Sequence, residues 1–234
     1  YDVAFSLADT AADAVAGNDS FTEPLDTVAL TRIYDNYTQV IVRKDADIES
    51  VEDFEGKTVS TGSPKSGTEV IANRLIEAAG LEEGDVNAQR IDLTKTVDSM
   101  KDGTIDAMVW SGGLPTAGVT DLFTSAGDDV EILDISDLIE PMQELNEVYE
   151  VAELQADTYG EQEAVETIVT PNVLMVRSDM DNGTACAITK LVYDKHDDLV
   201  AVHAAAEGIE ESKAAEVSPI ELHPGAQQAL DELG

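Results

Sequence analysis

The chain has 234 residues, enough for one large domain or two lobes, and 43% of them are hydrophobic, so it can build a core and is not expected to be disordered. Its 49 acidic residues face only 13 basic ones, which gives a formal net charge of −36. Such a surface repels phosphate backbones and anionic lipid headgroups, so the composition excludes binding to nucleic acid or to an anionic membrane surface.

In chain order, the apolar pattern first predicts a short buried strand around Val3 and Phe5 and a helix over 9–15 that ends near Gly17. Further strands are expected at 28–33, 38–43, 58–61, 88–93, 105–110 and 130–135, and as two pieces of 165–177 joined across Pro171. Further helices are expected from Val70 to a stop at Gly80, over 94–101, after Pro115, over 136–149 with a break at Pro141, over 182–206 and over 225–233. This alternation predicts an α/β fold with a mostly parallel sheet covered on both faces.

The acidic residues are spread along the whole chain instead of forming one tail. At low salt their mutual repulsion weakens a compact fold, whereas 1 M salt shortens the Debye length to ~3 Å and suppresses it. We therefore expect a protein from a salt-adapted organism; an ordinary acidic protein, or one that collects divalent cations, is the alternative. A calcium-loop pattern that begins at Asp179 lacks the required Glu, because Lys190 stands at the twelfth position, and no metal or cofactor is expected.

Ligands of α/β sheets bind in the loops that lead from strands into helices. The loop over 61–69 is small, polar and rich in glycine, and it opens a helix whose exposed amides suit a carboxylate or phosphate. Ser66 and Glu69 could instead form a capping box. The candidate ligand-binding residues of this loop are Gly62, Ser63, Ser66, Gly67 and Thr68.

A second loop of the same kind contributes Ser111, Gly112, Gly113 and Leu114. A tight turn beneath a packed helix is the alternative explanation for its paired glycines. Ser6, after the first strand, is a third candidate, although Asp9 nearby is more simply explained as a helix cap.

Catalysis finds little support in the sequence. His196, His203 and His223 lie outside the glycine-rich loops, and none has a Ser or Cys placed as a nucleophile. Carboxylate pairs are so common in this chain that they carry no information about acid–base chemistry. The single Cys186 allows no intramolecular disulfide, and no apolar run approaches the ~18 residues of a membrane span. No leader is visible at Tyr1, so we expect a processed or cut chain. We expect a binding protein and no enzyme.

Several segments resemble the type II periplasmic binding proteins. They are Val-Ile-Val-Arg-Lys-Asp-Ala-Asp-Ile at 40–48, Val-Glu-Asp-Phe-Glu-Gly-Lys-Thr-Val-Ser-Thr-Gly at 51–62 and Ser-Gly-Thr-Glu at 66–69. Lys-Asp-Gly-Thr-Ile-Asp-Ala at 101–107, Ser-Gly-Gly-Leu-Pro-Thr-Ala at 111–117 and Leu-His-Pro-Gly-Ala at 222–226 are similar to the TAXI branch of TRAP transporter receptors. Each motif alone is weak, but their order and spacing over nearly the whole chain are specific.

The resemblance implies an extracytoplasmic two-lobed receptor with a ligand cleft between its lobes. It would bind a small carboxylate such as glutamate and deliver it to TRAP-type membrane permease subunits, with no membrane insertion of this segment. Lobe one would hold 1–44 and 169–234, and lobe two 45–168. Such receptors usually begin with a further strand–helix segment, so we expect the N-terminal part of lobe one to be absent here. A ligand-sensing domain of a signalling or regulatory protein with the same fold is the alternative.

Overall fold

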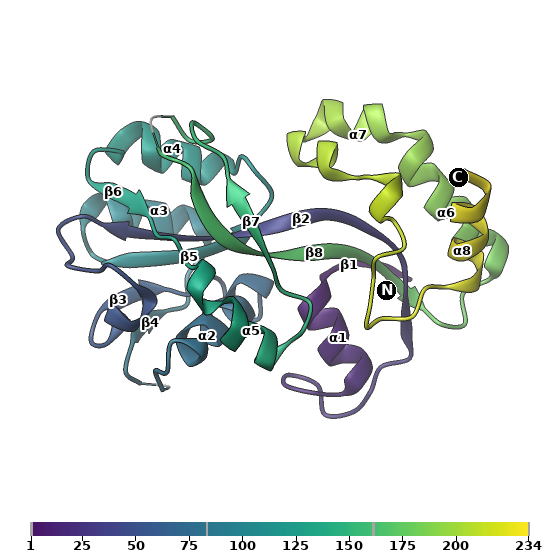
Figure 1. Cartoon of the computed structure of the whole chain (residues 1–234), viewed down its shortest axis with the longest axis horizontal. Helices are drawn as coiled ribbons and strands as arrows, with labels where there is room; N and C mark the ends of the chain where they lie inside the picture. Colours follow the sequence, from purple (N-terminus) through teal and green to yellow (C-terminus); the bar gives the residue numbers. More distant parts are fainter. Residues whose placement is uncertain (1, 83, 161, 234) are drawn as a thin grey trace. The chain divides into compact units, whose positions relative to one another are not determined.

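The computed structural model describes residues 2–82, 84–160 and 162–233. Its internal contacts divide the chain into unit 1, formed by Tyr1–Asn36 and Thr170–Gly234, and unit 2, formed by Tyr37–Val169. Two strands, β2 (Thr27–Arg43) and β8 (Val165–Arg177), continue from one unit into the other (Figure 1). The boundaries expected from the sequence lie at 44/45 and 168/169.

Short strands alternate with helices between these two long strands. The remaining strands are β1 (Val3–Leu7), β3 (Thr58–Ser60), β4 (Asn87–Gln89), β5 (Ala107–Gly112), β6 (Val130–Ile132) and β7 (Glu150–Leu154). The helices are α1 (Ala8–Ala16), α2 (Gly67–Ala78), α3 (Leu93–Asp102), α4 (Ala117–Ala126), α5 (Ile139–Leu145), α6 (Asn182–Asp194), α7 (His196–Val202) and α8 (Pro224–Leu233). Within the described residues, no helix is both long enough and apolar enough to cross a membrane.

The α/β class is confirmed, but the expectation of a mostly parallel sheet is wrong. Only β3 pairs in parallel among the described strand pairs, with β4 on one side and β5 on the other. The pairs β1–β8, β2–β5, β2–β6 and β7–β8 are antiparallel. Helical crossovers impose parallel pairing only around β3, and the short connection from β7 to β8 requires an antiparallel pair.

Both long strands were expected as two pieces. β2 is continuous because the residues between its predicted halves are also extended. In β8, Pro171 lies between the stretch that pairs with β7, which ends at Val169, and the stretch that pairs with β1, which begins at Asn172. The missing N–H of proline therefore costs neither ladder a hydrogen bond.

In unit 2, the strands run in the order β4-β3-β5-β2, and helices lie on both sides of them. Ile41 of β2 and Met108 of β5 pack against apolar side chains of α3 and α4. Figure 1 shows α2 and α5 on the opposite side of these strands. Side chains alternate along a strand, so Thr38, Val40 and their partners on β5 belong to this opposite side.

The helix expected over 136–149 differs from the structure. A 3₁₀ turn at Ser136–Leu138 leads into α5, which ends at Leu145, and Pro141 lies in the first turn of α5 and does not break it. Proline is tolerated in the first turn because the amide there has no partner within the helix. Strand β7 was missed, since its acidic sequence Glu-Val-Ala-Glu-Leu does not read as a buried strand.

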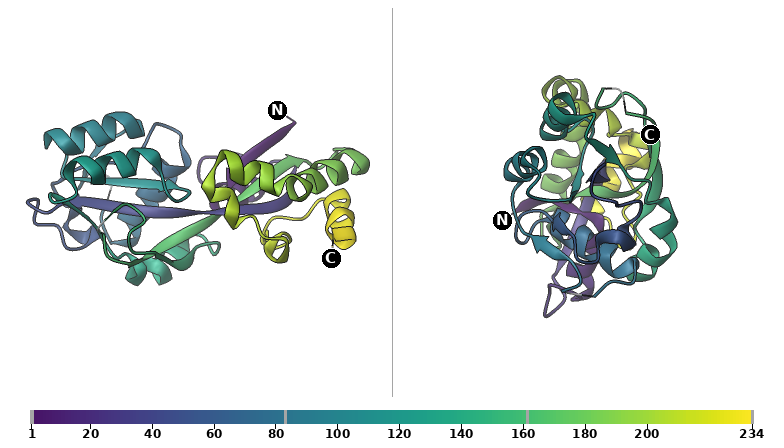
Figure 2. Two further views of the ribbon diagram at one scale, coloured as in Figure 1. Left: turned by 90° about the horizontal axis from the view of Figure 1, so that it is seen from above. Right: turned by 90° about the vertical axis from the view of Figure 1, so that its left-hand side faces the viewer.

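In unit 1, helices α6 and α8 lie side by side (Figures 1 and 2) and cover the apolar side chains of β2 and β8. The first strand is present, but the expectation that it is buried is wrong. Phe5 is 70% exposed and Val3 is 38% exposed. In the described part of the chain β1 is the end strand of its sheet and pairs only with β8, so its outer edge has no neighbour.

Candidate functional site

The loop between β3 and α2 is built around Gly62. This glycine has φ +90°, a conformation that L side chains rarely adopt. A Cβ at this position would lie 2.8 Å from Cβ and Cγ2 of Thr68, closer than real Cβ atoms approach. Gly62 is therefore required both by its backbone conformation and by the close approach of the first turn of α2.

The capping box suggested for this loop forms in part, because the Ser66 side chain caps α2 but the Glu69 carboxylate bonds to the amide of Lys65 and not to that of Ser66. Ser66 is the N-cap of α2, and its Oγ accepts a hydrogen bond from the amide of Glu69 at 3.2 Å. The carboxylate of Glu69 accepts in turn from the amide of Lys65 at 2.5 Å. Ser66 and Glu69 thus hold the loop in shape at the helix N-terminus.

The amides of Gly67 and Thr68 occupy the first two positions of α2. Within the described residues, neither amide donates a hydrogen bond. A helix N-terminus carries about half a positive charge in its unpaired N–H groups. These two amides can therefore hold an oxygen of an anionic ligand.

The second glycine-rich loop meets the first through a hydrogen bond. The amide of Ser111 donates to Oγ1 of Thr68 at 3.4 Å, and both residues are buried. A Cβ on Gly112 would lie 2.7 Å from Nε1 of Trp110, so packing of the indole explains this glycine. Leu114 is half-buried and packs against the apolar cluster beneath α3 and α4.

Internal hydrogen bonds fix the rest of the second loop. Nε1 of Trp110 donates to Oγ1 of Thr116 at 3.0 Å, and that hydroxyl donates to the carbonyl of Gly113 at 2.9 Å. The amide of Thr116 donates to the Tyr159 hydroxyl at 3.1 Å, and this hydroxyl donates to Oε1 of Gln39 at 2.7 Å. Burial raises the pKa of Tyr159 above its usual value despite these hydrogen bonds.

Two buried hydroxyls beside these loops lack partners in the described structure. Oγ1 of Thr38 and Oγ of Ser111 make no hydrogen bond, although the residues are only 1% and 9% exposed. Thr38 of β2 is the direct register partner of Ser111 of β5. No local pattern singles out Thr38 as a site residue, because a threonine in a Val/Ile-rich run is also an ordinary strand residue.

Two further candidates, Ser63 and Ser6, form hydrogen bonds with nearby backbone groups. Ser63 accepts a hydrogen bond at its carbonyl from the amide of Ser66 at 3.1 Å. Ser6 belongs to unit 1, whereas the other candidate residues belong to unit 2. Its hydroxyl donates to the carbonyl of Leu7 at 3.0 Å. The structure thus brings the two loops of unit 2 together. Ligand binding by Ser6 stays a prediction.

The carboxylate of Glu69, at the end of the first loop, is paired with Arg90. Burial pushes the pKa of Glu69 upward, but hydrogen bonds from Arg90 and from the amide of Lys65, together with the charge of Arg90, leave that pKa lowered. Arg90 forms an ion pair with Glu69. Glu69 therefore stays ionised at neutral pH without leaving an uncompensated negative charge beside the helix N-terminus.

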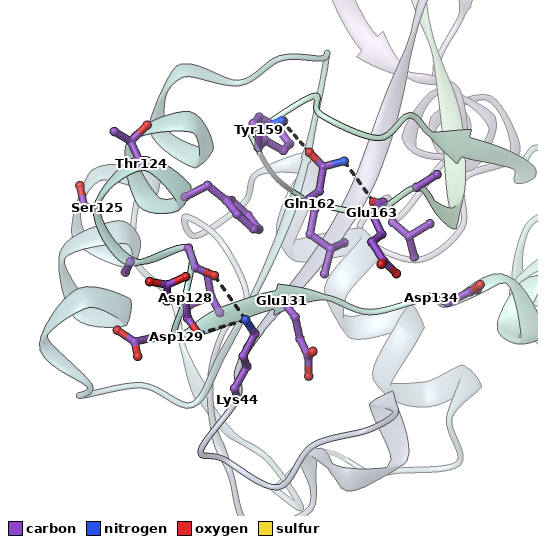
Figure 3. Close-up of a pocket in the computed structure, with 18 of the residues that line it drawn as sticks. Lys44, Thr124, Ser125, Asp128, Asp129, Glu131, Asp134, Tyr159, Gln162 and Glu163 are labelled. Atoms are coloured by element: carbon purple, nitrogen blue, oxygen red, sulfur yellow. Dashed lines mark hydrogen bonds between the residues drawn. The ribbon is translucent and has the colours of Figure 1, made fainter.

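A cavity of about 1010 Å³ lies elsewhere in unit 2 (Figure 3), and none of the candidate residues lines it. Its carboxylates are those of Asp128, Asp129, Glu131, Asp134, Glu153, Glu163 and Glu166. Lys44 also lines it, and its ammonium group donates to the carbonyls of Gly127 and Asp128. This concentration of negative charge repels an anionic solute, so the cavity does not suit the ligand that the two loops can hold.

The histidines of unit 1 form hydrogen bonds with nearby backbone groups. Nδ1 of His223 accepts from the amide of Gly225 at 3.0 Å, and Nε2 lies 3.0 Å from the carbonyl of Met180. His223 thus caps α8, which begins at Pro224. Among the described residues, no group of three or more His, Cys, Asp or Glu side chains could hold a metal ion.

The fold is similar to solved structures of periplasmic binding proteins. It matches the aliphatic sulphonate binding protein SsuA of Escherichia coli with a TM-score of 0.54 at 13% identity, over 98% of this chain and 65% of that one. XAC2383 of Xanthomonas citri, solved bound to ATP, matches with a TM-score of 0.57 at 14% identity, over 99% of this chain and 76% of that one. A periplasmic sulfonate-binding protein SsuA of Methylobacillus flagellatus matches with a TM-score of 0.52 at 12% identity, over 88% of this chain and 52% of that one.

At these identities the likeness shows the fold alone, and it confirms the expected architecture of the periplasmic binding proteins. The chain spans less than two thirds of the two SsuA proteins. The sequence of residues 1–234 also matches the profile of the NMT1-like family. The chain belongs to the NMT1-like family.

Proposed function

We propose that the protein is the extracytoplasmic solute receptor of a TRAP-type transporter of the TAXI branch, and that it binds a small carboxylate such as glutamate. The observation that carries this proposal is the N-terminus of α2, where the amides of Gly67 and Thr68 donate no hydrogen bond within the described structure. This arrangement suits one carboxylate group.

The second loop supports the same ligand position. Ser111 is tied to Thr68 by its amide, so a solute held at the start of α2 also lies next to the stretch from Ser111 to Leu114. The TAXI assignment rests on the resemblance of 101–107, 111–117 and 222–226 to that branch. Delivery to permease subunits and the extracytoplasmic location follow from the assignment. The net charge of −36 supports a salt-adapted source.

The amide of Gly67 can be tested by Gly67→Pro. Proline fits the first helical position and removes the N–H, and the extended Ser66 before it, with φ −91° and ψ 160°, is compatible with proline. The matched control is Asn182→Pro, which changes the first position of α6 after Asp181, also in an extended conformation. Both variants should keep the unfolding midpoint of the wild type.

Binding is measured as thermal stabilisation of the full-length protein in high salt by glutamate, 2-oxoglutarate and methanesulfonate. A ligand at a hundredfold its dissociation constant adds about 2.7 kcal/mol. Gly67→Pro should lose most of this stabilisation and Asn182→Pro none. If no acid stabilises the wild type, or if Gly67→Pro responds like the wild type, the assignment of the site is wrong.

A further inference from the structure

The pair Thr38 and Ser111 interrupts an otherwise apolar surface. On the same side of the same two strands, the next register partners are Val40 and Val109, which are fully or almost fully buried. Facing side chains on neighbouring antiparallel strands lie within contact distance of each other. The two side chains therefore face each other, although their hydroxyls form no hydrogen bond with one another, at the end of the strand pair where the Ser111 amide bonds to Thr68 of α2.

A buried hydroxyl without a partner lowers the stability of a fold. Valine and alanine would fill the same space at less cost, as they do elsewhere along this side of β2 and β5. Two residues that face each other, Thr38 and Ser111, thus each lower the stability of the fold by burying a hydroxyl without a partner. Residues of this kind are typical of binding sites, where function and stability conflict.

We propose that Oγ1 of Thr38 and Oγ of Ser111 donate hydrogen bonds to the ligand held by the amides of Gly67 and Thr68, and that this ligand presents a singly charged oxyanion. The inference rests on the proposed function and deepens it by naming the charge class of the solute. The chain's own donors at this place would then be two hydroxyls and two amides, all of them neutral.

The charges around the loop support the single negative charge. Arg90 pairs with Glu69, and Arg74 donates to the Tyr149 hydroxyl at 3.2 Å, so each of these guanidinium groups already has a partner. Lys65 is exposed. A helix N-terminus supplies only about half a charge, which matches a carboxylate or sulfonate better than a phosphate dianion. The net charge of −36 opposes a second negative charge further.

The hydroxyls are tested by Thr38→Val and Ser111→Ala in the full-length protein. The control is Thr189→Val in α6, because Thr189 is equally buried but its hydroxyl donates to the carbonyl of Ala185 at 3.0 Å. Two quantities are measured in high salt: the urea midpoint without ligand and the affinity for glutamate, methanesulfonate and methyl phosphate.

Thr38→Val and Ser111→Ala should keep or raise the urea midpoint while weakening binding roughly 10- to 100-fold, the range for a hydrogen bond to a charged group. Thr189→Val should lower the midpoint and leave the affinity unchanged. A purely structural role for Thr38 would give the opposite pattern, a lower midpoint with intact affinity, and would overturn the inference. If the wild type binds none of the three probes, the proposed function itself is wrong.

The charge class is tested by pH. Methyl phosphate has its second pKa at about 6, so its monoanion disappears as the pH rises, whereas methanesulfonate keeps a single charge. Between pH 5 and pH 7.5 the affinity for methyl phosphate should fall roughly 30-fold, and the affinity for methanesulfonate should stay constant. Binding of methyl phosphate that strengthens over this range would overturn the single-charge assignment and leave the receptor function standing.

Discussion

Gly225 is the position where one added methyl group has the clearest structural consequence. A Cβ there would lie 2.2 Å from the carbonyl oxygen of Asn182 and 2.9 Å from its Cα and carbonyl carbon. These are backbone atoms at the start of α6, so they cannot rotate away as a side chain would. Gly225→Ala therefore forces α8 and α6 apart at the place where both helices begin.

The magnitude follows from two opposing effects. Alanine gains up to about 1 kcal/mol over glycine in helix propensity, whereas overpacking a close contact costs about 1–3 kcal/mol. Because the clash is with backbone, we expect the upper end of that cost and a net loss of about 2 kcal/mol in the free energy of unfolding. This is a large share of the roughly 5–15 kcal/mol that stabilises a typical domain.

The assay is urea unfolding in high salt, followed by circular dichroism, with Gly183→Ala as the matched control. Gly183 is also the second residue of its helix, but a Cβ there would meet only a side-chain oxygen of Asp181, at 3.1 Å. The control should be neutral or slightly more stable than the wild type. Equal midpoints for Gly225→Ala and Gly183→Ala would refute the reasoning from the close contact.

Three further predictions concern charge and hydrogen bonding. Glu69 has a lowered pKa, so its ionised form stabilises the fold above the ordinary pKa of 4.5, and this contribution is lost as the pH falls through the lowered value. Glu69→Gln should therefore have a lower urea midpoint than the wild type at about pH 7, with the difference vanishing in acid; a constant difference would contradict the pairing with Arg90. Tyr159→Phe removes the partner of Gln39 and of the Thr116 amide, and should cost roughly 1–3 kcal/mol by the same assay; an unchanged midpoint would show that these hydrogen bonds are dispensable. The melting temperature should rise when KCl is increased from about 0.1 M to 1 M, because the Debye length falls from about 10 to 3 Å, and a flat response would count against salt adaptation.

Local sequence signals predicted much of the fold. Gly17 and Gly80 correctly marked the ends of α1 and α2, and both have positive φ angles in the structure, while the apolar spacing located α2 itself. Strand pairing was harder, because the direction of a pair depends on connections that span the chain. The continuity of β8 through Pro171 could not be read locally, since it depends on where two other strands stop pairing.

The candidate site shows the same limit. Glycines and hydroxyls at the start of α2 pointed to a loop that can hold an anion, because residue types alone suggest exposed amides. Thr38 could not be found in this way. Its significance comes from pairing with Ser111, 73 positions later in the chain, and from a lack of hydrogen-bond partners within the described structure. Both facts belong to the folded sheet.

The division of unit 1 into two chain segments also sets the order in which the molecule can fold during synthesis. Leu30 and Ile33 of the first segment pack against Leu174, Val176 and Ala226 of the second. At the usual rate of translation, on the order of ten seconds separate the emergence of these two groups, and all of unit 2 is made in between. The early segment must therefore keep its apolar strand uncovered while unit 2 becomes complete. During synthesis the first segment of unit 1 therefore emerges first, the complete unit 2 follows, and the helices that complete unit 1 emerge last.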